Sequence, residues 1–454
     1  MDLFRRPGTP PRMKALPQGR PTVVSVLDIG TSKMCCIVAR LVPQPQSAVL
    51  PGRTHAIEVL GLGHTRSAGV KGGKIVDVER AELAVRQAVE QAERQADLTV
   101  TSLIVNVSCG RIGSAAFSTE IELGGREIEG ADIRAVLQAG ASEALEGRGG
   151  AIPRIVLHSL PIGYRLDGEG DVRDPRGMAA SRLGVDMHVV DAEAAPARNL
   201  EIAVNRAHLS VDAMVASPFA SGLSALVEDE ALMGCAVIDM GAGTTTLSVF
   251  LHGRFVFADA VAVGGAHVTM DLARGLSTRV EDAERIKVLH GCVVDPAAVP
   301  ASFEEDTVSV PPMSDEGCGG QAVSRLDLAR IIGPRVDETL ELMRDRLVRS
   351  GFAAAVNGRV VLTGGAAMLP GLPQAAERIL AARVRVGRPL GLRGLPPAAK
   401  GPAFATAAGM LIYPQVAGEE FAAGAPAPTS GTEGPRPAAA GGTFSRWGAW
   451  LKTI

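Results

Sequence analysis

The chain has 454 residues, of which 46% are apolar and 21% are charged, and its formal net charge is −3. This composition excludes a largely disordered chain, and the near-neutral charge argues against a nucleic-acid-binding protein. No apolar run is long enough for a transmembrane helix, and the six cysteines form no C-x-x-C pair, which favours a reducing cytosol. Aromatic residues make up only 3%, and both tryptophans, Trp447 and Trp450, lie in the last eight residues.

Residues 1–20 are rich in proline and basic residues and lack the apolar stretch of a secretory signal, so we expect a disordered basic arm. Residues 22–27 read as a buried strand, and residues 34–39 as its return strand across a polar turn, which together make a hairpin. Asp77 is placed to cap a long helix that ends near Gln95, because apolar residues then recur at helical spacing.

A second strand–turn–strand pattern begins at Cys235 and repeats the first. The segment Val-Leu-Asp-Ile-Gly-Thr around Asp28 resembles Val-Ile-Asp-Met-Gly-Ala around Asp239. Internal similarity of this kind indicates a duplication, so we expect an α/β protein of two duplicated halves. The expected parts are a first core subdomain (21–101 and 191–227), an inserted α+β subdomain (102–190), a second core subdomain (228–270 and 355–414), its outer subdomain (271–354), a flexible linker (415–442) and a short amphipathic helix (443–454).

The two turns carry the chemistry that we expect. A tight turn between strands directs backbone N–H groups at one point, and glycines allow close approach, so the turn can cradle an anion. The candidate phosphate-binding residues are Asp28, Gly30, Thr31, Ser32 and Lys33 in the first turn, and Asp239, Gly241, Gly243, Thr244 and Thr245 in the second. Asp28 and Asp239 are also candidates to hold a hydrated Mg²⁺.

One such turn alone is more often an ordinary hairpin, but two matched turns facing each other would clamp a nucleotide. A third motif supports this interpretation: the strand ending at Thr363 runs into Gly364 and Gly365, where bare backbone can accommodate a purine or ribose. The sequence contains neither G-x-x-x-x-G-K-[ST] nor G-x-G-x-x-G, so the two commonest nucleotide fingerprints do not apply.

In order and spacing, these three motifs resemble the phosphate-1, phosphate-2 and adenosine motifs of the actin/Hsp70/sugar-kinase superfamily. Within it, the chain resembles the FtsA family of bacterial cell division proteins, with further support from residues 70–73, 91–93 and 282–291 and from the terminal helix. The resemblance implies an actin-like ATPase fold around a nucleotide cleft, with a small α+β subdomain inserted in the first half. It implies ATP and Mg²⁺ as ligands, and Glu284 and Lys287 near the ribose and base.

The resemblance also implies partners and a location. These are self-assembly into a polymer, an FtsZ C-terminal tail bound to the outer subdomain, later division proteins on residues 102–190, and peripheral attachment to the cytoplasmic face of the inner membrane at the division site. A basic patch could receive the acidic FtsZ tail, with Arg325, Leu328 and Arg335 as candidates, although solvated arginines on a helix face are an equal alternative.

Two positions depart from the family pattern. Ala242 interrupts the glycines of the second turn and would resist a positive φ. Thr246 stands where the family often has an acidic residue, so we expect at most a weak ATPase, with ATP acting as an assembly ligand.

The C-terminal segment has the pattern of an interfacial helix. Phe444, Trp447, Leu451 and Ile454 recur at 3-4-3 spacing, with Trp450 beside them, and Arg446 and Lys452 flank that stripe. Such a helix binds an anionic membrane surface, although docking on its own domain or in a protein groove would fit the pattern too. A small-molecule kinase or a type IV pilus assembly scaffold of the same fold remains the alternative function, and neither would need this tail.

Overall fold

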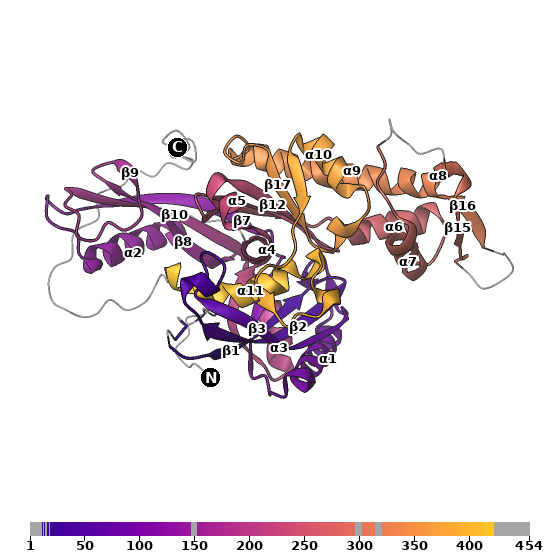
Figure 1. Cartoon of the computed structure of the whole chain (residues 1–454), viewed down its shortest axis with the longest axis horizontal. Coiled ribbons are helices and arrows are strands. Elements are labelled where there is room, and N and C mark those ends of the chain that lie inside the picture. The colour runs from indigo at the N-terminus through magenta and orange to yellow at the C-terminus, as the bar shows by residue number, and fades with distance from the viewer. Residues whose placement is uncertain are drawn as a thin grey trace.

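The computed structural model describes Pro11, Met13, Leu16 and Pro17 and residues 19–146, 152–295, 302–313 and 320–421. Two β-sheets form the centre of the molecule, and Figure 1 shows two further regions that project from it in opposite directions. One is the inserted subdomain, which includes residues 113–193, and the other is the outer region, which includes residues 265–350. Met13 and Leu16 pack against the first core, so this part of the N-terminal arm is not disordered as predicted.

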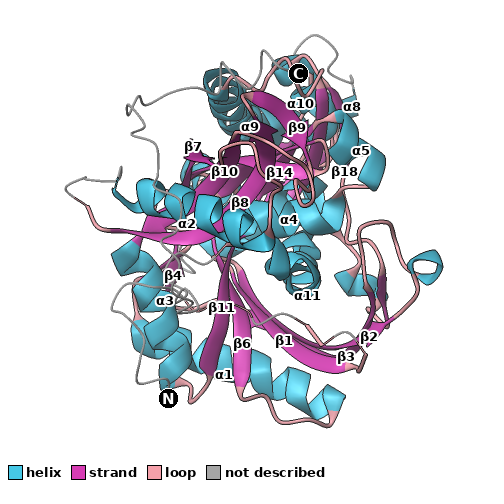
Figure 2. Cartoon of the chain, turned by 90° about the vertical axis from the view of Figure 1, so that its left-hand side faces the viewer, coloured by secondary structure: helices cyan, strands magenta, loops and turns pink. Residues whose placement is uncertain are grey.

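The first sheet has the strand order β11-β6-β1-β2-β3-β19 (Figure 2). Strand β1 runs antiparallel to β2 and parallel to β6, and β2 is antiparallel to β3, which confirms the predicted hairpin. The strands are β1 (Thr22–Ile29), β2 (Lys33–Pro43), β3 (His55–Arg66), β6 (Ser102–Val107), β11 (Ser210–Ala216) and β19 (Leu392–Arg393), with the short pair β4 (Val70–Lys71) and β5 (Lys74–Ile75) nearby.

Four helices accompany this sheet. Asp77 caps α1 as predicted, because its side chain accepts a hydrogen bond from the Arg80 amide at 3.1 Å. The apolar stripe of α1 is buried against β3 and β2. The four helices are α1 (Val78–Ala96), α3 (Ala194–Arg206), α4 (Ser217–Ala225) and α11 (Ala405–Val416).

The second sheet has the strand order β14-β13-β12-β17-β18, which corresponds to the order β3-β2-β1-β6-β11 of the first sheet. Strands β12 and β13 form an antiparallel hairpin, and β13 is also antiparallel to β14. Strand β12 is parallel to β17, and β17 is parallel to β18. The matching order confirms the duplication that the two Asp-centred motifs predict. The strands are β12 (Cys235–Met240), β13 (Thr245–Leu251), β14 (Arg254–Val261), β17 (Arg359–Thr363) and β18 (Arg383–Val386).

The outer region of the second half is mainly helical. Its predicted boundary at residue 270 falls inside α6, so the region begins near Gly265 instead. Helix α9 has Ser324 as its N-cap and buries Val336, Leu340, Met343 and Leu347 on one face. Its elements are α6 (Gly265–Gly275), α7 (Val280–His290), α8 (Ser302–Glu305), β15 (Thr307–Val310), β16 (Gln321–Ser324) and α9 (Arg325–Ser350). Two further helices, α5 (Glu228–Met233) and α10 (Leu372–Leu380), contact β13 and β18 of the second sheet.

The inserted subdomain is a four-stranded sheet of order β7-β10-β8-β9 with one helix packed on it. The predicted start at residue 102 is wrong, because β6 lies inside the first sheet between β11 and β1. At the other end, β10 continues past residue 190 to Glu193. The elements are β7 (Gly113–Glu122), α2 (Gly130–Glu146), β8 (Arg154–Leu166), β9 (Glu169–Val172) and β10 (Arg182–Glu193).

The folded body also continues beyond the predicted start of the linker at residue 415. Helix α11 runs to Val416, and a 3-10 turn covers Ala417–Glu419. The Gln415 side chain accepts hydrogen bonds from the backbone amides of Thr54 and His55, at 2.9 and 3.0 Å. The rest of the predicted linker, from residue 422 on, and the predicted helix 443–454 lie outside the described residues.

Candidate functional site

A cavity of about 400 Å³ lies where the β1–β2 turn, the β12–β13 turn, the end of β17 and α7 meet. All but one of the predicted nucleotide-binding residues line it. They are Asp28, Gly30, Thr31, Ser32, Lys33, Asp239, Gly241, Gly243, Thr244, Glu284, Lys287, Gly364 and Gly365. The structure therefore brings four segments that are far apart in the sequence to one concave site.

The two turns are closed by the same hydrogen bond. The Gly30 amide donates to the Lys33 carbonyl at 3.1 Å, and the Gly241 amide donates to the Thr244 carbonyl at 2.9 Å. A Cβ added to Gly30 or Gly241 would lie 2.8 or 2.9 Å from that same carbonyl oxygen. Glycine is therefore required at both positions by close backbone approach.

Ala242 fits the second turn without the strain expected from the sequence. Throughout the described chain, the non-glycine residues with left-handed φ values lie elsewhere, and Ala242 is not among them. Its carbonyl accepts a hydrogen bond from the Ala266 amide at 2.8 Å, and the Gly241 carbonyl accepts one from the Gly265 amide at 2.9 Å. The first amides of α6 thus hold this turn in place.

Asp28 and Asp239 face the same cavity from the two sheets. Burial raises the pKa of Asp28 to about 6, with Lys33 acting against the shift and the nearby Asp239 adding to it. Burial also raises the pKa of Asp239, although hydrogen bonds from Thr406 and Ser221 lower it in part. Two buried carboxylates that disfavour each other's ionisation form a site that a divalent cation would relieve.

Lys33 is held against the opposite wall of the cavity. Its Nζ donates to the Ala403 carbonyl at 2.7 Å and lies 3.2 Å from the centroid of the Phe404 ring. Burial lowers the pKa of Lys33, while Asp28 opposes this shift. This ammonium is therefore poised beside the two carboxylates, where a negatively charged ligand would favour its charged form.

Thr245 is the one predicted nucleotide-binding residue that does not line the cavity, whereas its neighbour Thr246 does line it. The Thr245 hydroxyl donates to the Val263 carbonyl at 2.8 Å, so it holds the loop between β14 and α6 and does not line the cavity. Thr246 lines the cavity, and its buried Oγ1 has no hydrogen-bond partner within the described structure. Successive side chains of a strand point to opposite faces, which explains why adjacent threonines differ.

Glu284 and Lys287 project from α7 toward the start of α6. The Lys287 Nζ donates to the Gly265 carbonyl at 3.0 Å, to Thr269 Oγ1 at 2.8 Å and to Glu284 Oε2 at 2.6 Å. Both side chains line the cavity while they join α6 to α7. They form the side wall that the sequence motif predicts.

The Gly364–Gly365 turn approaches the second Asp directly. Gly364 has a left-handed φ of 85°, and a Cβ there would lie 2.3 Å from Asp239 Oδ1. Its amide donates to the Pro402 carbonyl at 3.2 Å. Any side chain at this position would displace the Asp239 carboxylate.

Sequence reasoning missed several polar residues of the cavity wall, among them Asn106, Ser217 and Thr406. Asn106 Oδ1 accepts from the Ile29 amide at 2.7 Å, and Asn106 Nδ2 donates to Ser217 Oγ at 3.2 Å. Thr406 Oγ1 donates to Asp239 Oδ2 at 2.8 Å. Each is an isolated polar residue near the start or end of an apolar helix or strand. That isolation was the only feature of the sequence that could have identified them as cavity residues.

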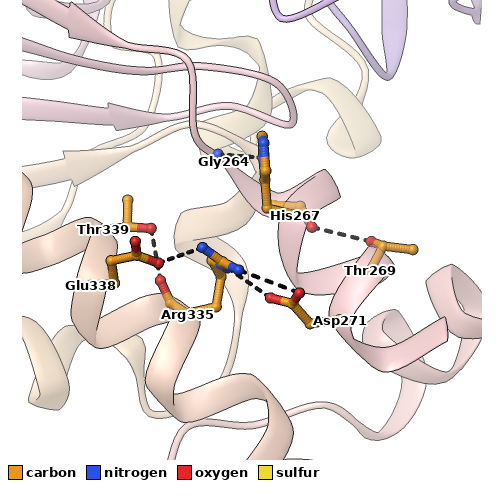
Figure 3. Close-up of polar contacts among 8 residues, drawn as sticks. Gly264, His267, Thr269, Asp271, Arg335, Glu338 and Thr339 are labelled. Carbon is orange, nitrogen blue, oxygen red and sulfur yellow. Dashed lines mark hydrogen bonds and ion pairs between the residues drawn. The ribbon is translucent and has the colours of Figure 1, made fainter. Parts of the chain in front are cut away.

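The predicted partner-binding residues do not form one surface. Leu328 has 0% exposure and belongs to the core of the second half, so its prediction as a surface residue is wrong. Arg335 pairs with Asp271 on α6 at 2.7 Å and with Glu338 one turn further along α9 (Figure 3). Arg325 pairs with Asp306 at 3.1 Å and stacks on the Phe303 ring.

The predicted membrane residues Phe444, Trp447, Trp450, Leu451 and Ile454 lie outside the described residues. Within the part of the chain that is described, no helix is both long and apolar enough to cross a membrane.

Two family models match the chain. The model "Cell division protein FtsA" matches residues 236–409, and "SHS2 domain inserted in FTSA" matches residues 109–191. The second range agrees with the corrected start of the inserted subdomain after β6.

Among curated proteins, the chain is similar to the cell division protein FtsA of Rhizobium meliloti (strain 1021), with 54% identity over 97% of each chain. It is also similar to the cell division protein FtsA of Pseudomonas aeruginosa, with 32% identity over 85% of this chain and 88% of that protein. Among solved structures, a chain of the PilM-PilN type IV pilus biogenesis complex matches with a TM-score of 0.59 at 14% identity, covering 88% of this chain and 99% of that one. The predicted actin-like fold with an inserted subdomain is confirmed.

Proposed function

Because this chain belongs to the FtsA family of cell division proteins, we propose that it binds ATP in the cavity between its two sheets and tethers FtsZ filaments to the cytoplasmic face of the inner membrane. The observation that carries the nucleotide part is the pair of matched turns. Each is closed by the same backbone hydrogen bond, and both open on one cavity of about 400 Å³.

Phosphates would lie between the two turns, where backbone amides and the hydroxyls of Thr31, Ser32 and Thr244 can donate to them. Asp28 and Asp239 would hold Mg²⁺ through water, and the cation would neutralise phosphate charge there. The free Thr246 hydroxyl would gain a partner from the ligand or its water. The base and ribose would lie between α7 and the Gly364–Gly365 turn.

ATP is more plausible as an assembly ligand than as a rapidly consumed substrate. The cavity-facing position after the second turn is Thr246, which cannot act as a carboxylate base. We therefore propose slow hydrolysis at most, with filament formation following ATP binding. Among the described carboxylates of the cavity wall, Asp239 accepts a hydrogen bond from Thr406 and Glu284 pairs with Lys287, which favours ligand holding over the role of a kinase base.

The membrane part of the proposal rests on the sequence of residues 443–454. Phe444, Trp447, Leu451 and Ile454 would enter the lipid interface, with Trp450 at the headgroup level. A single helix of this size binds weakly, and a filament carrying many copies binds tightly through avidity. ATP-dependent assembly would therefore switch membrane attachment on.

The FtsZ tail would bind the outer region of the second half, where Arg325 is the better candidate. Its ion-pair partner Asp306 is exposed by about half, whereas Arg335 is engaged by both Asp271 and Glu338. Later division proteins would bind the inserted subdomain.

Co-sedimentation with anionic liposomes tests the central claim. We expect the full chain to pellet with vesicles when ATP and Mg²⁺ are present, and a chain ending at Gly442 to stay in the supernatant. Equal pelleting of both chains would contradict the membrane role of the terminal helix. Direct titration with a fluorescent ATP analogue tests the cavity separately, and absence of binding would contradict the nucleotide part.

A further inference from the structure

The last described residues of the chain are fastened to the inserted subdomain. Glu420 Oε1 lies 2.7 Å from Nδ1 of His158 on β8, with side-chain exposures of 4% and 0%. The next amide, of Phe421, donates to the Ser159 carbonyl at 2.9 Å. The Phe421 ring also packs against the core of the inserted subdomain. We call residues 417–421 with these attachments the C-terminal dock.

His158 faces two partners at once. Its Nε2 accepts a hydrogen bond from the Ala216 amide at 2.8 Å, so Nε2 carries no proton. Nδ1 is therefore the protonated nitrogen, and it donates to the Glu420 carboxylate. The imidazole is further fixed by edge-on contacts with the rings of Phe219 and Tyr413, at centroid distances of 5.0 and 5.7 Å.

From Ala216, the contacts continue into the nucleotide cavity. Ser217, the next residue, accepts from Asn106 Nδ2 at 3.2 Å, and Asn106 Oδ1 accepts from the Ile29 amide at 2.7 Å. Ile29 follows Asp28 directly at the start of the first phosphate turn. His158 is thus linked to this turn by buried hydrogen bonds.

A second route joins the dock to the other turn. Helix α11 begins at the cavity, where Thr406 Oγ1 donates to Asp239, and it ends at Val416, just before the dock. A helix of this length spans roughly 18 Å, and α11 is buried almost throughout. It passes between the two sheets in Figure 1. The dock therefore closes a ring of contacts that runs from Asp28 to Asp239.

We propose that the C-terminal dock positions both phosphate turns, with His158 as the positioning residue. A change at residues 417–421, where the C-terminal segment leaves the folded body, then alters nucleotide affinity. This rests on the proposed function, because it takes the cavity to be the ATP site and the tail to be the membrane segment. By reciprocity, ATP held between the turns stabilises the dock.

The test uses the full chain with Glu420→Ala, which removes the His158 partner. Glu419→Ala is the matched control, because Glu419 is the exposed neighbouring carboxylate. Glu420→Gln keeps an acceptor oxygen for Nδ1 and should restore the wild-type behaviour. Phe421→Ala weakens the same attachment without leaving a buried hydrogen-bond donor unpaired, which keeps the test informative if Glu420→Ala unfolds.

The first readout is amide hydrogen exchange of nucleotide-free protein. Exchange at Ala216 and Ile29 should be about five times faster in Glu420→Ala and Phe421→Ala than in Glu419→Ala or wild type. The second readout is affinity for a fluorescent ATP analogue, which should fall about three- to tenfold in the same two variants.

Faster exchange confined to residues 417–421 and β8, with Ile29 and ATP affinity unchanged, would overturn the proposal and leave the dock as a local anchor. Failure of the wild-type chain to bind the ATP analogue would instead contradict the proposed function. The exchange comparison needs no nucleotide, so it still decides whether the dock reaches the first turn.

Discussion

Thr31 and Gly243 abut across the cavity, each at the tip of a turn from a different sheet. A Cβ on Gly243 would lie 2.3 Å from Thr31 Oγ1, closer than real Cβ contacts allow. Thr31 is itself fixed, because its Oγ1 accepts from the Gly73 amide at 3.1 Å. The separation of the two turns is therefore set by the absence of one side chain.

Gly243→Ala should push the two turns apart. We expect ATP affinity to fall at least about tenfold, which corresponds to about 1.4 kcal/mol. Titration with a fluorescent ATP analogue measures the effect. Gly163→Ala on β8 is the control, because a Cβ there meets nothing within 4 Å and the backbone is ordinary. Equal affinities for the two variants would show that the contact with Thr31 does not set the spacing.

The buried Asp28 carboxyl makes stability depend on pH. Burial raises the pKa of this carboxyl from its usual 3.8 to about 6. The folded chain therefore holds this proton more tightly than the unfolded chain, and stability falls as pH rises from about 4 to about 6. Asp28→Asn removes this titrating group. Its free energy of unfolding, taken relative to that of wild type, should therefore increase by about 1 kcal/mol from pH 5 to pH 7.

Urea unfolding of nucleotide-free wild type and Asp28→Asn at both pH values measures this difference. Asp229→Asn, an exposed substitution of the same kind, is the control. If the difference in the free energy of unfolding between Asp28→Asn and wild type is the same at pH 5 and pH 7, the result contradicts a raised pKa for this carboxyl.

The adjacent threonines of β13 should respond in opposite ways to the same substitution. Thr245→Val removes the hydrogen bond to the Val263 carbonyl and should lower the free energy of unfolding by about 1–2 kcal/mol. Thr246→Val removes a hydroxyl with no partner in the described structure, so it should not destabilise the nucleotide-free protein. ATP affinity should fall in Thr246→Val alone.

Chemical denaturation and ATP titration of the two variants check both halves of this prediction, and each variant serves as the other's control. Loss of ATP affinity in Thr245→Val at unchanged stability would mean that Thr245 contacts the ligand after all.

Substitutions of Leu328 and Arg325 should differ in their effects: the first should lower stability, and the second should weaken partner binding. Leu328→Ala leaves a cavity in the second core and should cost about 2–5 kcal/mol. Arg325→Ala breaks a partly exposed ion pair with Asp306, which is worth at most about 1 kcal/mol. With an FtsZ tail peptide as ligand, we expect Arg325→Ala to weaken binding while it melts like wild type. Normal binding by a folded Arg325→Ala protein would remove this residue from the partner site.

The sequence predicted the parts of this structure that local patterns encode. The Asp77 cap, the helix that follows it and the two hairpins follow from capping, helical periodicity and strand patterns within short windows. The cavity lining followed because the two turns repeat each other and glycine is needed at both.

The misses share a different cause. Strand β6 was assigned to the inserted subdomain because its parallel partners β1 and β11 are far away in the sequence. The predicted linker begins at residue 415 because the composition changes there to Ala, Gly, Pro, Thr and Glu, whereas Glu420 is held by a histidine 262 residues earlier in the sequence. Leu328 was a candidate for partner binding together with Arg325 and Arg335, although its side chain is buried in the second core.

The two sheets have matching strand orders and share one buried core where they face each other, because Val237, Phe250 and Val361 of the second sheet belong to the same cluster as the first sheet. A nucleotide held by one turn from each sheet would be released when either sheet unfolds, so both sheets would share its binding free energy. At a ligand concentration one hundred times its dissociation constant, that is about 2.7 kcal/mol. ATP would thus add a second link between two sheets that already share a core, and calorimetry would record this as a rise in the unfolding temperature with ATP concentration.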